Sequence, residues 1–229
     1  MDRQEWLEER RALAEAQFDA LYAPTYDADD VPITGTHQRF VTRVIDSCPV
    51  GGTILDAPCG IGRYFGMILA AGRQVVGIDQ SAGMLAQARA KHPDAVLEKI
   101  GLQELAFDAQ FDAAICVDSM ENVFPEDWPM VLGNLRRAVR PGGLVYLTVE
   151  QIDAAGITRV FDEATADGLP VVRGEHTRRG GGYHFYPTED QVAGWLAAEG
   201  LEVVVEGRSS GDSYGYHHLL VRGPGDSEE

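Results

Sequence analysis

The sequence has few cysteines, few cations relative to acids, and no long apolar run. Only Cys48, Cys59 and Cys116 occur among 229 residues, and their spacing shows no pairing. Such a sparse, odd set argues against a disulfide framework and against a zinc site. No segment approaches the length of a membrane span, and the charged N-terminus lacks an apolar secretion core. We therefore expect a cytoplasmic protein that has no membrane partner.

Positive charge is scarce. The chain has 19 Lys and Arg against 36 Asp and Glu, which gives a formal net charge of −17. Proteins that bind nucleic acids usually present a basic face that displaces counterions from phosphates. The most basic stretch, residues 173–184, holds three arginines and one glutamate, and we interpret it as a solvated loop. The composition predicts no nucleic-acid partner and suits a cationic ligand.

Apolar residues make up 45% of the chain, which is typical of a globular protein with a core. Short apolar runs alternate with helical patterns from residue 37 onward, and this alternation predicts a parallel sheet with helices on both faces. Two late apolar runs lie too close together for a helical crossover, so we expect them to pair antiparallel. The predicted strands are 53–57, 74–79, 95–99, 111–118, 144–150, 201–207 and 216–223, and the predicted helices are 2–22, 37–48, 64–72, 81–92, 128–140, 153–166 and 187–200.

We expect one domain over residues 1–229. Residues 1–36 would form an N-terminal helical cap and lid loop, residues 37–223 the core, and residues 224–229 a flexible tail. The pattern loosens after residue 151, where a loop rich in Gly and Arg precedes a helix that Thr188 is placed to cap.

The stretch TILDAPCGIGRY, residues 53–64, carries the strongest motif. A predicted strand ends at Asp56, and the glycines that follow let a ligand approach the backbone closely. We place the start of the next helix near Ile61, so that its free N–H groups point at the ligand. Asp79 ends the next strand, where a carboxylate can hold both hydroxyls of a ribose. The pattern predicts a nucleotide-like ligand, while a dinucleotide fingerprint would need a glycine at Phe65.

Five segments between residues 37 and 223 occur in an order that is typical of one protein family: ILDAPCGIGR, VVGIDQSAGMLAQARA, IGLQELAFDAQFDAAIC, LRRAVRPGGLVYLTVE and YPTEDQVAGWLAAEGLEVV. In this order they resemble the class I S-adenosylmethionine-dependent methyltransferases of the small-molecule type. The resemblance implies an α/β, Rossmann-like fold, with a seven-stranded, mostly parallel sheet, helices on both faces and an antiparallel last strand. It also implies S-adenosyl-L-methionine as the donor and S-adenosyl-L-homocysteine as the product, but it says little about the acceptor.

The resemblance assigns donor-binding roles by position. The methionine part would be held at Asp56, Ala57, Pro58, Gly60 and Gly62, the ribose by Asp79, the adenine by Gln80, Met84, Leu102 and Gln103, and the amino group by the Cys116 carbonyl. Two positions depart from the family pattern, because Pro58 replaces the first motif glycine and Gly101 replaces the acid of the adenine loop. Core packing is the alternative for Met84 and Cys116, and a helix-turn acid is the alternative for Asp79.

The acceptor side is less defined, because methyl transfer needs a base only when the acceptor must lose a proton. We assign catalytic roles to Asp118, Tyr26 and His184. The alternative for Asp118 is a helix cap or a solvated acid. Of the adjacent His217 and His218 in the last strand, we expect one to face the core and one the solvent. Further candidates are Tyr22, His37, Glu121, Asn122, Arg178, Arg179, Tyr183 and Tyr186.

The function predicted is in-line transfer of a methyl group to an O or N atom of a small molecule, without a metal. The alternatives are a protein or tRNA methyltransferase of the same fold, a non-catalytic methyltransferase-fold binding protein, and a nicotinamide oxidoreductase. The oligomeric state is open, with a homodimer among the options.

Overall fold

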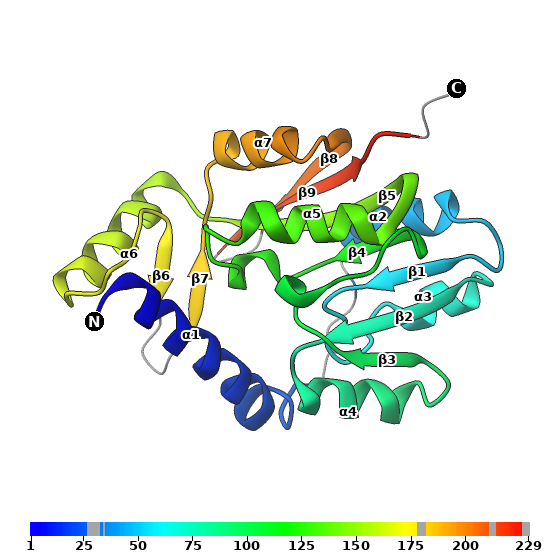
Figure 1. Cartoon of the computed structure of the whole chain (residues 1–229), viewed down its shortest axis with the longest axis horizontal. Coiled ribbons are helices and arrows are strands. Elements are labelled where there is room, and N and C mark those ends of the chain that lie inside the picture. Colours follow the sequence, from blue (N-terminus) through cyan, green and yellow to red (C-terminus); the bar gives the residue numbers. More distant parts are fainter. Residues whose placement is uncertain (27–32, 34, 178–181, 211–213, 226–229) are drawn as a thin grey trace.

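The computed structural model describes residues 1–26, 33, 35–177, 182–210 and 214–225. Arg178 and Arg179, most of the predicted lid loop and the end of the predicted tail lie outside the described residues. Figure 1 shows one sheet through the centre of the molecule, with helices packed around it and the N-terminal helix along one side. No helix in the described ranges has the length and apolar character needed to cross a bilayer.

The central sheet has seven strands in the order β3-β2-β1-β4-β5-β9-β8. The first five pair in parallel, and β9 runs antiparallel to both of its neighbours. This arrangement confirms the predicted Rossmann-like class and the antiparallel last strand. The strands are β1 (Thr53–Asp56), β2 (Gln74–Asp79), β3 (Val96–Lys99), β4 (Phe111–Cys116), β5 (Val139–Gln151), β8 (Glu202–Ser210) and β9 (Gly215–Arg222).

The helices follow the apolar periodicity of the sequence, and two of them begin at residues whose side chains cap the helix, one of which is the predicted Thr188. Ser81 accepts a bond from the Met84 amide, and Thr188 accepts one from the Gln191 amide. The helical elements are α1 (Arg3–Gln17), the π-helix η1 (Phe18–Tyr22), α2 (Gly35–Ser47), α3 (Phe65–Ala70), α4 (Ala82–Lys91), η3 (Leu102–Glu104), η4 (Met120–Asn122), α5 (Trp128–Ala138), α6 (Ala154–Ala166) and α7 (Glu189–Ala198).

Each face of the sheet has its own core, because successive strand residues point to opposite faces. Ile54 and Tyr146 pack with residues of α2 and α3 on one face. Leu55 and Leu147 pack with residues of α5 and α7 on the other face. Helices therefore cover both faces of the parallel strands. A ligand site is expected at the carboxyl ends of these strands.

The N-terminal helix is attached to the core by a buried ion pair. Arg3 of α1 donates to both carboxylate oxygens of Glu175, at 3.0 and 2.9 Å, and the Glu175 side chain is fully buried. The Tyr183 hydroxyl also donates to Glu175, at 2.7 Å. Glu175 and Tyr183 lie on a two-stranded ribbon, β6 (Glu175–Thr177) and β7 (Tyr183–Phe185), that the sequence analysis missed. Figure 1 shows α1 beside this ribbon and extending toward α4.

Three predicted boundaries and orientations are wrong. The helix after β1 begins at Phe65 rather than near Ile61, because Gly60 and Gly62 have φ of +52° and +78° and residues 60–64 form turns. The predicted strand 144–150 is longer than expected, because β5 starts at Val139 with an irregular register and includes residues 141–143, expected to form a turn between helix and strand.

His217 and His218 are both buried, so the expected split between core and solvent is also wrong. His217 Nε2 lies 2.8 Å from Glu206 Oε2 of the neighbouring strand. His218 stacks on Phe40 of α2 and lies 2.7 Å from the Tyr146 hydroxyl. His218 therefore finds its polar partner in the core, whereas His217 pairs with an exposed carboxylate at the surface of β8.

Candidate functional site

A pocket with about 990 Å³ of empty space lies at the carboxyl ends of β1, β2 and β4. The strand order reverses between β1 and β4, and ligands of open α/β sheets bind beside such a switch point. Two sides of the pocket differ in character: the glycine-turn side, formed by Pro58, Gly60, Asp79, Gln80 and Gln103, and the Asp118 side, formed by Tyr26, Arg63, Tyr64, Asp118 and Asn122.

The glycine turn brings backbone to the pocket wall. Pro58 and Gly60 line the cavity, whereas Ala57 and Gly62 do not. A Cβ at Gly62 would come within 3.0 Å of the Phe65 ring, and its positive φ would strain any L side chain. Gly62 therefore serves the turn itself, and Gly60 is the glycine that a ligand can approach.

Asp56 lies below the turn instead of in the pocket lining. It ends β1, is 1% exposed, and its Oδ2 has no hydrogen-bond partner among the described residues. Burial raises the pKa of Asp56 well above its usual range, and the nearby charge of Asp79 adds to this shift. Such an orphaned buried carboxyl oxygen is unusual, and a ligand group that donates a hydrogen bond would satisfy it.

Asp79 is fixed by the backbone and faces the cavity. Its Oδ2 accepts from the Gly60 amide at 2.9 Å, and its Oδ1 accepts from the Ser81 amide at 2.8 Å. A carboxylate has about four acceptor positions, so two remain for a ligand. Burial raises the pKa of Asp79, although the two backbone bonds oppose this effect. The geometry fits a pair of ligand hydroxyls, as expected for a ribose.

Four further residues of the pocket lining come from two segments of the chain. Gln80 and Met84 belong to one segment, and Leu102 and Gln103 of η3 belong to the other. The Asn134 amide of α5 donates to the Leu102 and Gln103 carbonyls at 2.9 and 3.2 Å, which fixes η3. Met84 is 3% exposed and packs with Ala23 and Ile61, so it belongs to both core and pocket wall.

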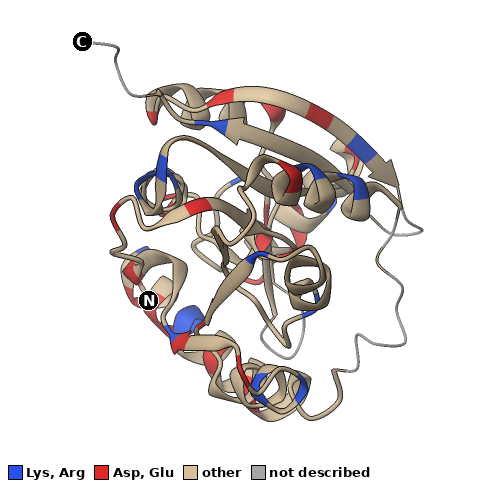
Figure 2. Ribbon diagram, turned by 90° about the vertical axis from the view of Figure 1, so that its right-hand side faces the viewer, with Lys and Arg blue, Asp and Glu red and all other residues tan. Residues whose placement is uncertain are grey.

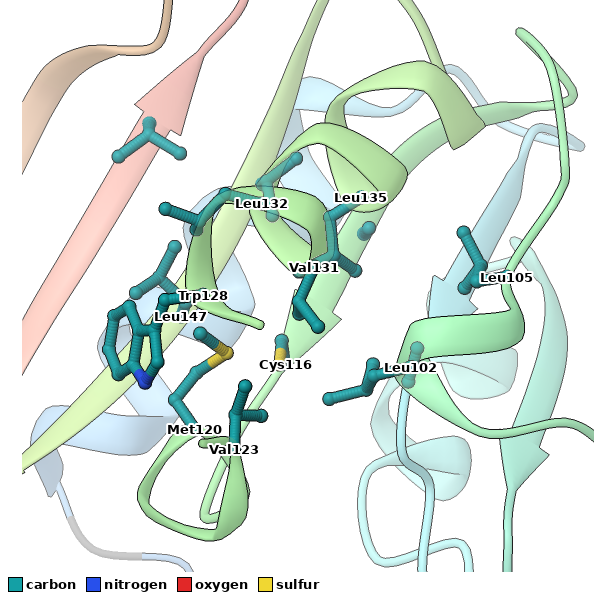
Figure 3. Close-up of a cluster of buried hydrophobic side chains, with 14 of the residues drawn as sticks. Leu102, Leu105, Cys116, Met120, Val123, Trp128, Val131, Leu132, Leu135 and Leu147 are labelled. Carbon is teal, nitrogen blue, oxygen red and sulfur yellow. The ribbon is translucent and has the colours of Figure 1, made fainter. Parts of the chain in front are cut away.

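Cys116 is the last residue of β4, and its side chain is fully buried. Figure 3 shows this thiol within an apolar cluster beside Met120, Val123 and Val131. Burial raises the pKa of Cys116 to about 12, so the thiol is not a nucleophile at neutral pH. Only the backbone of Cys116 is available for a ligand, and the neighbouring Val117 lines the pocket.

Asp118 borders the pocket just beyond β4 in an uncommon conformation. Its φ is +52°, and its amide donates to the buried Thr148 hydroxyl at 2.9 Å. Aspartate tolerates this left-handed region better than most residues. His37 Nε2 of α2 lies 3.7 Å from Asp118 Oδ1. The backbone geometry therefore directs the Asp118 carboxyl toward α2 and the cavity.

Tyr26 and Tyr64 share the Asp118 side. Burial raises the pKa of both phenols, and the charge of Asp118 adds to this shift while Arg63 opposes it. Both hydroxyls are therefore protonated at neutral pH and can donate hydrogen bonds. The structure thus brings two of the three predicted catalytic residues, Asp118 and Tyr26, to one cavity.

His184, the third predicted catalytic residue, is not among the lining residues. Its Nδ1 lies 2.7 Å from Glu150 Oε2 and 3.4 Å from the Tyr186 hydroxyl. The side chain of Glu150 is 2% exposed and lies at the end of β5. Three other candidates also lie outside the cavity lining. Tyr22 is exposed on η1, and Glu121 is buried behind the pocket wall. Tyr183 donates a hydrogen bond to Glu175 in the ribbon.

Sequence reasoning missed several lining residues, among them Phe18, Arg63, Tyr64 and Ser119. Arg63 and Tyr64 lie directly after the glycine motif, so their nearness to it was a usable signal. Phe18 comes from η1, where apolar spacing is indistinguishable from core packing. Among the described residues, no three His, Cys, Asp or Glu side chains are placed to share a metal ion.

The fold and this pocket define a Rossmann-like protein with a small-molecule pocket at the switch point of its sheet. Comparisons with known proteins narrow this class. Residues 54–143 match the family model described as a methyltransferase domain. Demethylmenaquinone methyltransferase of Renibacterium salmoninarum is 27% identical over 229 residues, which is 95% of each chain. Malonyl-[acyl-carrier protein] O-methyltransferase of Pectobacterium atrosepticum is 34% identical over 100 residues, 42% of this chain and 37% of that protein.

A solved structure agrees in fold over nearly the whole chain. The 1,6-didemethyltoxoflavin-N1-methyltransferase of Burkholderia thailandensis, with bound 1,6-didemethyltoxoflavin and S-adenosylhomocysteine, gives a TM-score of 0.73 at 18% identity. The match covers 95% of this chain and 90% of that chain. The comparisons therefore show a methyltransferase domain in residues 54–143 and a methyltransferase fold over nearly the whole chain.

Proposed function

We propose that this methyltransferase acts on an O or N atom of a small molecule that enters the pocket from the Asp118 side. The observation that carries this proposal is that one cavity joins the glycine-turn side to Asp118, Tyr26 and Tyr64. The donor supplies an electrophilic methyl group on a sulfonium. The protein must hold the acceptor atom in line with that methyl group and exclude water.

The donor-binding assignment follows from the geometry of the glycine-turn side. Asp79 would accept the ribose hydroxyls with its two remaining acceptor positions. Gln80, Met84, Leu102 and Gln103 would enclose the adenine. Backbone from Pro58 to Gly60 and the Cys116 carbonyl would face the methionine part, with Asp56 positioned below them.

On the acceptor side, Asp118 would orient the nucleophile and take its proton where it has one to lose. Tyr26 would donate a hydrogen bond and close the pocket from the N-terminal cap. His184 does not touch the cavity, and we assign it a positioning role through its 2.7 Å contact with Glu150. We infer that residues 1–36 work as a lid on the core, because Phe18 and Tyr26 both line the pocket.

Charge and relatives support a small acceptor. Lys and Arg are scattered over several elements in Figure 2, with acidic residues between them. The net charge of −17 opposes binding to a polyanion. The bound 1,6-didemethyltoxoflavin of the Burkholderia thailandensis enzyme is a small molecule.

The decisive experiment has a binding step and a transfer step. Calorimetry with S-adenosylmethionine and S-adenosylhomocysteine should show binding of both, and NADH should not compete. Incubation with methyl-labelled donor and a metabolite panel should then yield a labelled small molecule, whose methylated atom mass spectrometry identifies. Donor binding without any labelled product would favour a non-catalytic binding protein, and label in tRNA or protein would favour the macromolecular alternative.

A further inference from the structure

The Asp118 side of the pocket is bordered by carboxyl groups from separate parts of the chain. Asp118 lines the cavity, and Glu121 and Glu150 are buried at 6% and 2% exposure. Asn122, which also lines the cavity, donates to Glu121 Oε1 at 3.3 Å. Burial raises the pKa of Glu121 well above its usual range, and the charges of Asp118 and Glu150 add to this shift. The three carboxyl groups are therefore close enough to interact.

Each of these three carboxyl groups carries a buried oxygen with no hydrogen bond among the described residues, and for Asp118 this atom is Oδ1. Glu121 Oε2 and Glu150 Oε1 make no hydrogen bond to any described residue. Buried polar atoms in native proteins almost always have partners. Of the three carboxyl groups only Asp118 lines the cavity, and its unsatisfied oxygen favours a ligand that donates hydrogen bonds and carries positive charge.

Compensating cations are few on this side. Of the described residues that line the pocket, only Arg63 carries a permanent positive charge. His218 lies behind His37, with ring centres 4.7 Å apart, and burial together with His37 lowers the pKa of His218 to about 4. His218 is therefore neutral at physiological pH and cannot offset the carboxyl groups.

Ring faces complete the environment. Tyr26 and Tyr64 line the pocket beside Asp118, and their phenols remain neutral. Aromatic faces attract ammonium groups. A carboxylate or phenolate acceptor would instead approach acidic side chains, and like charges repel more strongly at a partly buried site than in water.

We propose that the acceptor is an amine, which enters the Asp118 side as an ammonium ion and is methylated on nitrogen. This inference rests on the proposed function and narrows its acceptor class. Asp118 accepts one proton from the ammonium, which leaves a neutral nitrogen with a lone pair. That lone pair forms the N–CH₃ bond while the S–CH₃ bond breaks and its electron pair stays on sulfur. The products are a methylated ammonium and the neutral thioether, and Asp118 returns its proton to solvent.

Binding to the protein loaded with S-adenosylhomocysteine tests the charge preference. Choline and its uncharged carbon analogue 3,3-dimethylbutan-1-ol have nearly the same shape. We expect calorimetry to show at least tenfold tighter binding of choline, and we expect Asp118→Asn to remove most of that preference. The control Asp94→Asn, at an exposed position after α4, should preserve it. Equal or tighter binding of the alcohol, or binding of neither probe, would overturn the amine assignment.

Transfer from labelled donor tests the same inference without a chosen acceptor. A cellular metabolite extract is separated by ion exchange at pH 7 into cationic, neutral and anionic fractions, and each fraction is incubated with enzyme and donor. Label in the cationic fraction is the expected result, and label confined to the other fractions overturns the inference. Calorimetry with S-adenosylhomocysteine separates the two failures. Lost donor binding defeats the proposed function itself, whereas intact donor binding without a cation preference defeats only the amine assignment.

Discussion

The two sides of the pocket are built in different ways. The glycine-turn side comes from short consecutive segments at the ends of β1 and β2, and its central acid, Asp79, is held by two backbone amides. The Asp118 side draws on the N-terminal cap, the glycine turn and the segment after β4, with α2, β5 and β9 behind them. One side is therefore fixed by local backbone, and the other by the packing of distant elements.

This difference explains what each side can do. A locally fixed backbone cradle suits a donor that the whole family shares, because its geometry depends on few residues. A wall made by six segments changes whenever one segment changes, so it suits an acceptor that differs from enzyme to enzyme. Substitutions on the two sides should accordingly affect different measurements, and the following predictions rank these effects from largest to smallest.

The largest effect is expected for Asp118→Asn. The amide keeps the size of the side chain and the contact region near His37 but cannot accept a full proton. Loss of a general base typically lowers turnover by about 10²–10⁴-fold. Turnover should fall by that range with the acceptor found in the metabolite screen, while calorimetric affinity for S-adenosylhomocysteine stays unchanged.

The control for this variant is Asp94→Asn, which should alter neither quantity. Normal turnover in Asp118→Asn would make Asp118 a structural acid that merely fills a left-handed backbone position. A parallel loss of donor affinity would show that the two sides of the pocket are not separable.

Asp79→Ala should affect the other side. Removing hydrogen bonds to a charged group costs about 1–3 kcal/mol, which corresponds to about 5–150-fold weaker donor binding. Calorimetry with S-adenosylhomocysteine measures this change, and Asp79→Asn should have a smaller effect because the amide oxygen still accepts a hydrogen bond. Unchanged affinity in the alanine variant would mean that the ribose is bound elsewhere.

Much of the glycine-turn side was predictable from the sequence, because its residues are set by local signals. The strand ends at Asp56 and Asp79, the glycines between them and the cap at Ser81 are local signals that need no tertiary context. The parallel direction of the early strands and the antiparallel pairing of β8 with β9 follow from connection lengths. The start of the helix after β1 was misplaced because the two left-handed glycines of the motif, one residue apart, extend the turn before it. The spacing of the glycines alone does not reveal their backbone conformation.

The Asp118 side was only partly predictable. Asp118 and Tyr26 were identified from their positions near the predicted site, but the φ of Asp118 depends on a bond to Thr148, 30 residues away. The burial of both His217 and His218 depends on tertiary contacts, because His218 packs on Phe40 of α2 while His217, on the opposite face of β9, contacts Glu206 of the neighbouring strand β8. The ribbon of β6 and β7 forms around the Arg3–Glu175 pair, which joins residues 172 positions apart. Such long-range contacts leave no periodic trace in the sequence.

The pH dependence of donor binding sharpens the role of Asp79. Burial raises the pKa of this carboxyl, so it gains a proton at a higher pH than an exposed aspartate does. The ionised form accepts the stronger hydrogen bonds. Donor affinity should therefore be highest at neutral pH and fall as the pH drops through this raised pKa.

Asp56 has a raised pKa as well and lies close enough to interact with Asp79, so the wild-type curve alone does not assign the effect. Calorimetry across this pH range should show a shallower curve for Asp79→Asn than for the wild type. Identical curves would assign the titration to Asp56 or to the donor.

The smallest effect is expected where the N-terminal cap meets the glycine-turn side. Asp19 Oδ1 of η1 accepts from the Ser81 hydroxyl at 2.6 Å and from the Gly83 amide at 2.9 Å, so it caps α4 from outside that helix. Loss of such a cap costs about 1 kcal/mol. Asp19→Ala should lower the free energy of unfolding in urea by about that amount and weaken donor binding only slightly.

The pH dependence of the stability that Asp19 contributes distinguishes a charged cap from a neutral packing contact. The bond from Ser81, followed by that from Gly83, lowers the pKa of Asp19. A carboxyl with a lowered folded-state pKa stabilises the protein above its unfolded-state pKa, and this contribution disappears as the pH falls through the folded-state value. The stability difference between wild type and Asp19→Ala should therefore be constant near neutrality and shrink in acid. The exposed substitution Asp94→Ala should show no such trend. A stability difference between wild type and Asp19→Ala that persists in acid would mean that Asp19 stabilises the protein by packing. The charge of Asp19 would then not be needed to hold the N-terminal cap on the glycine-turn side.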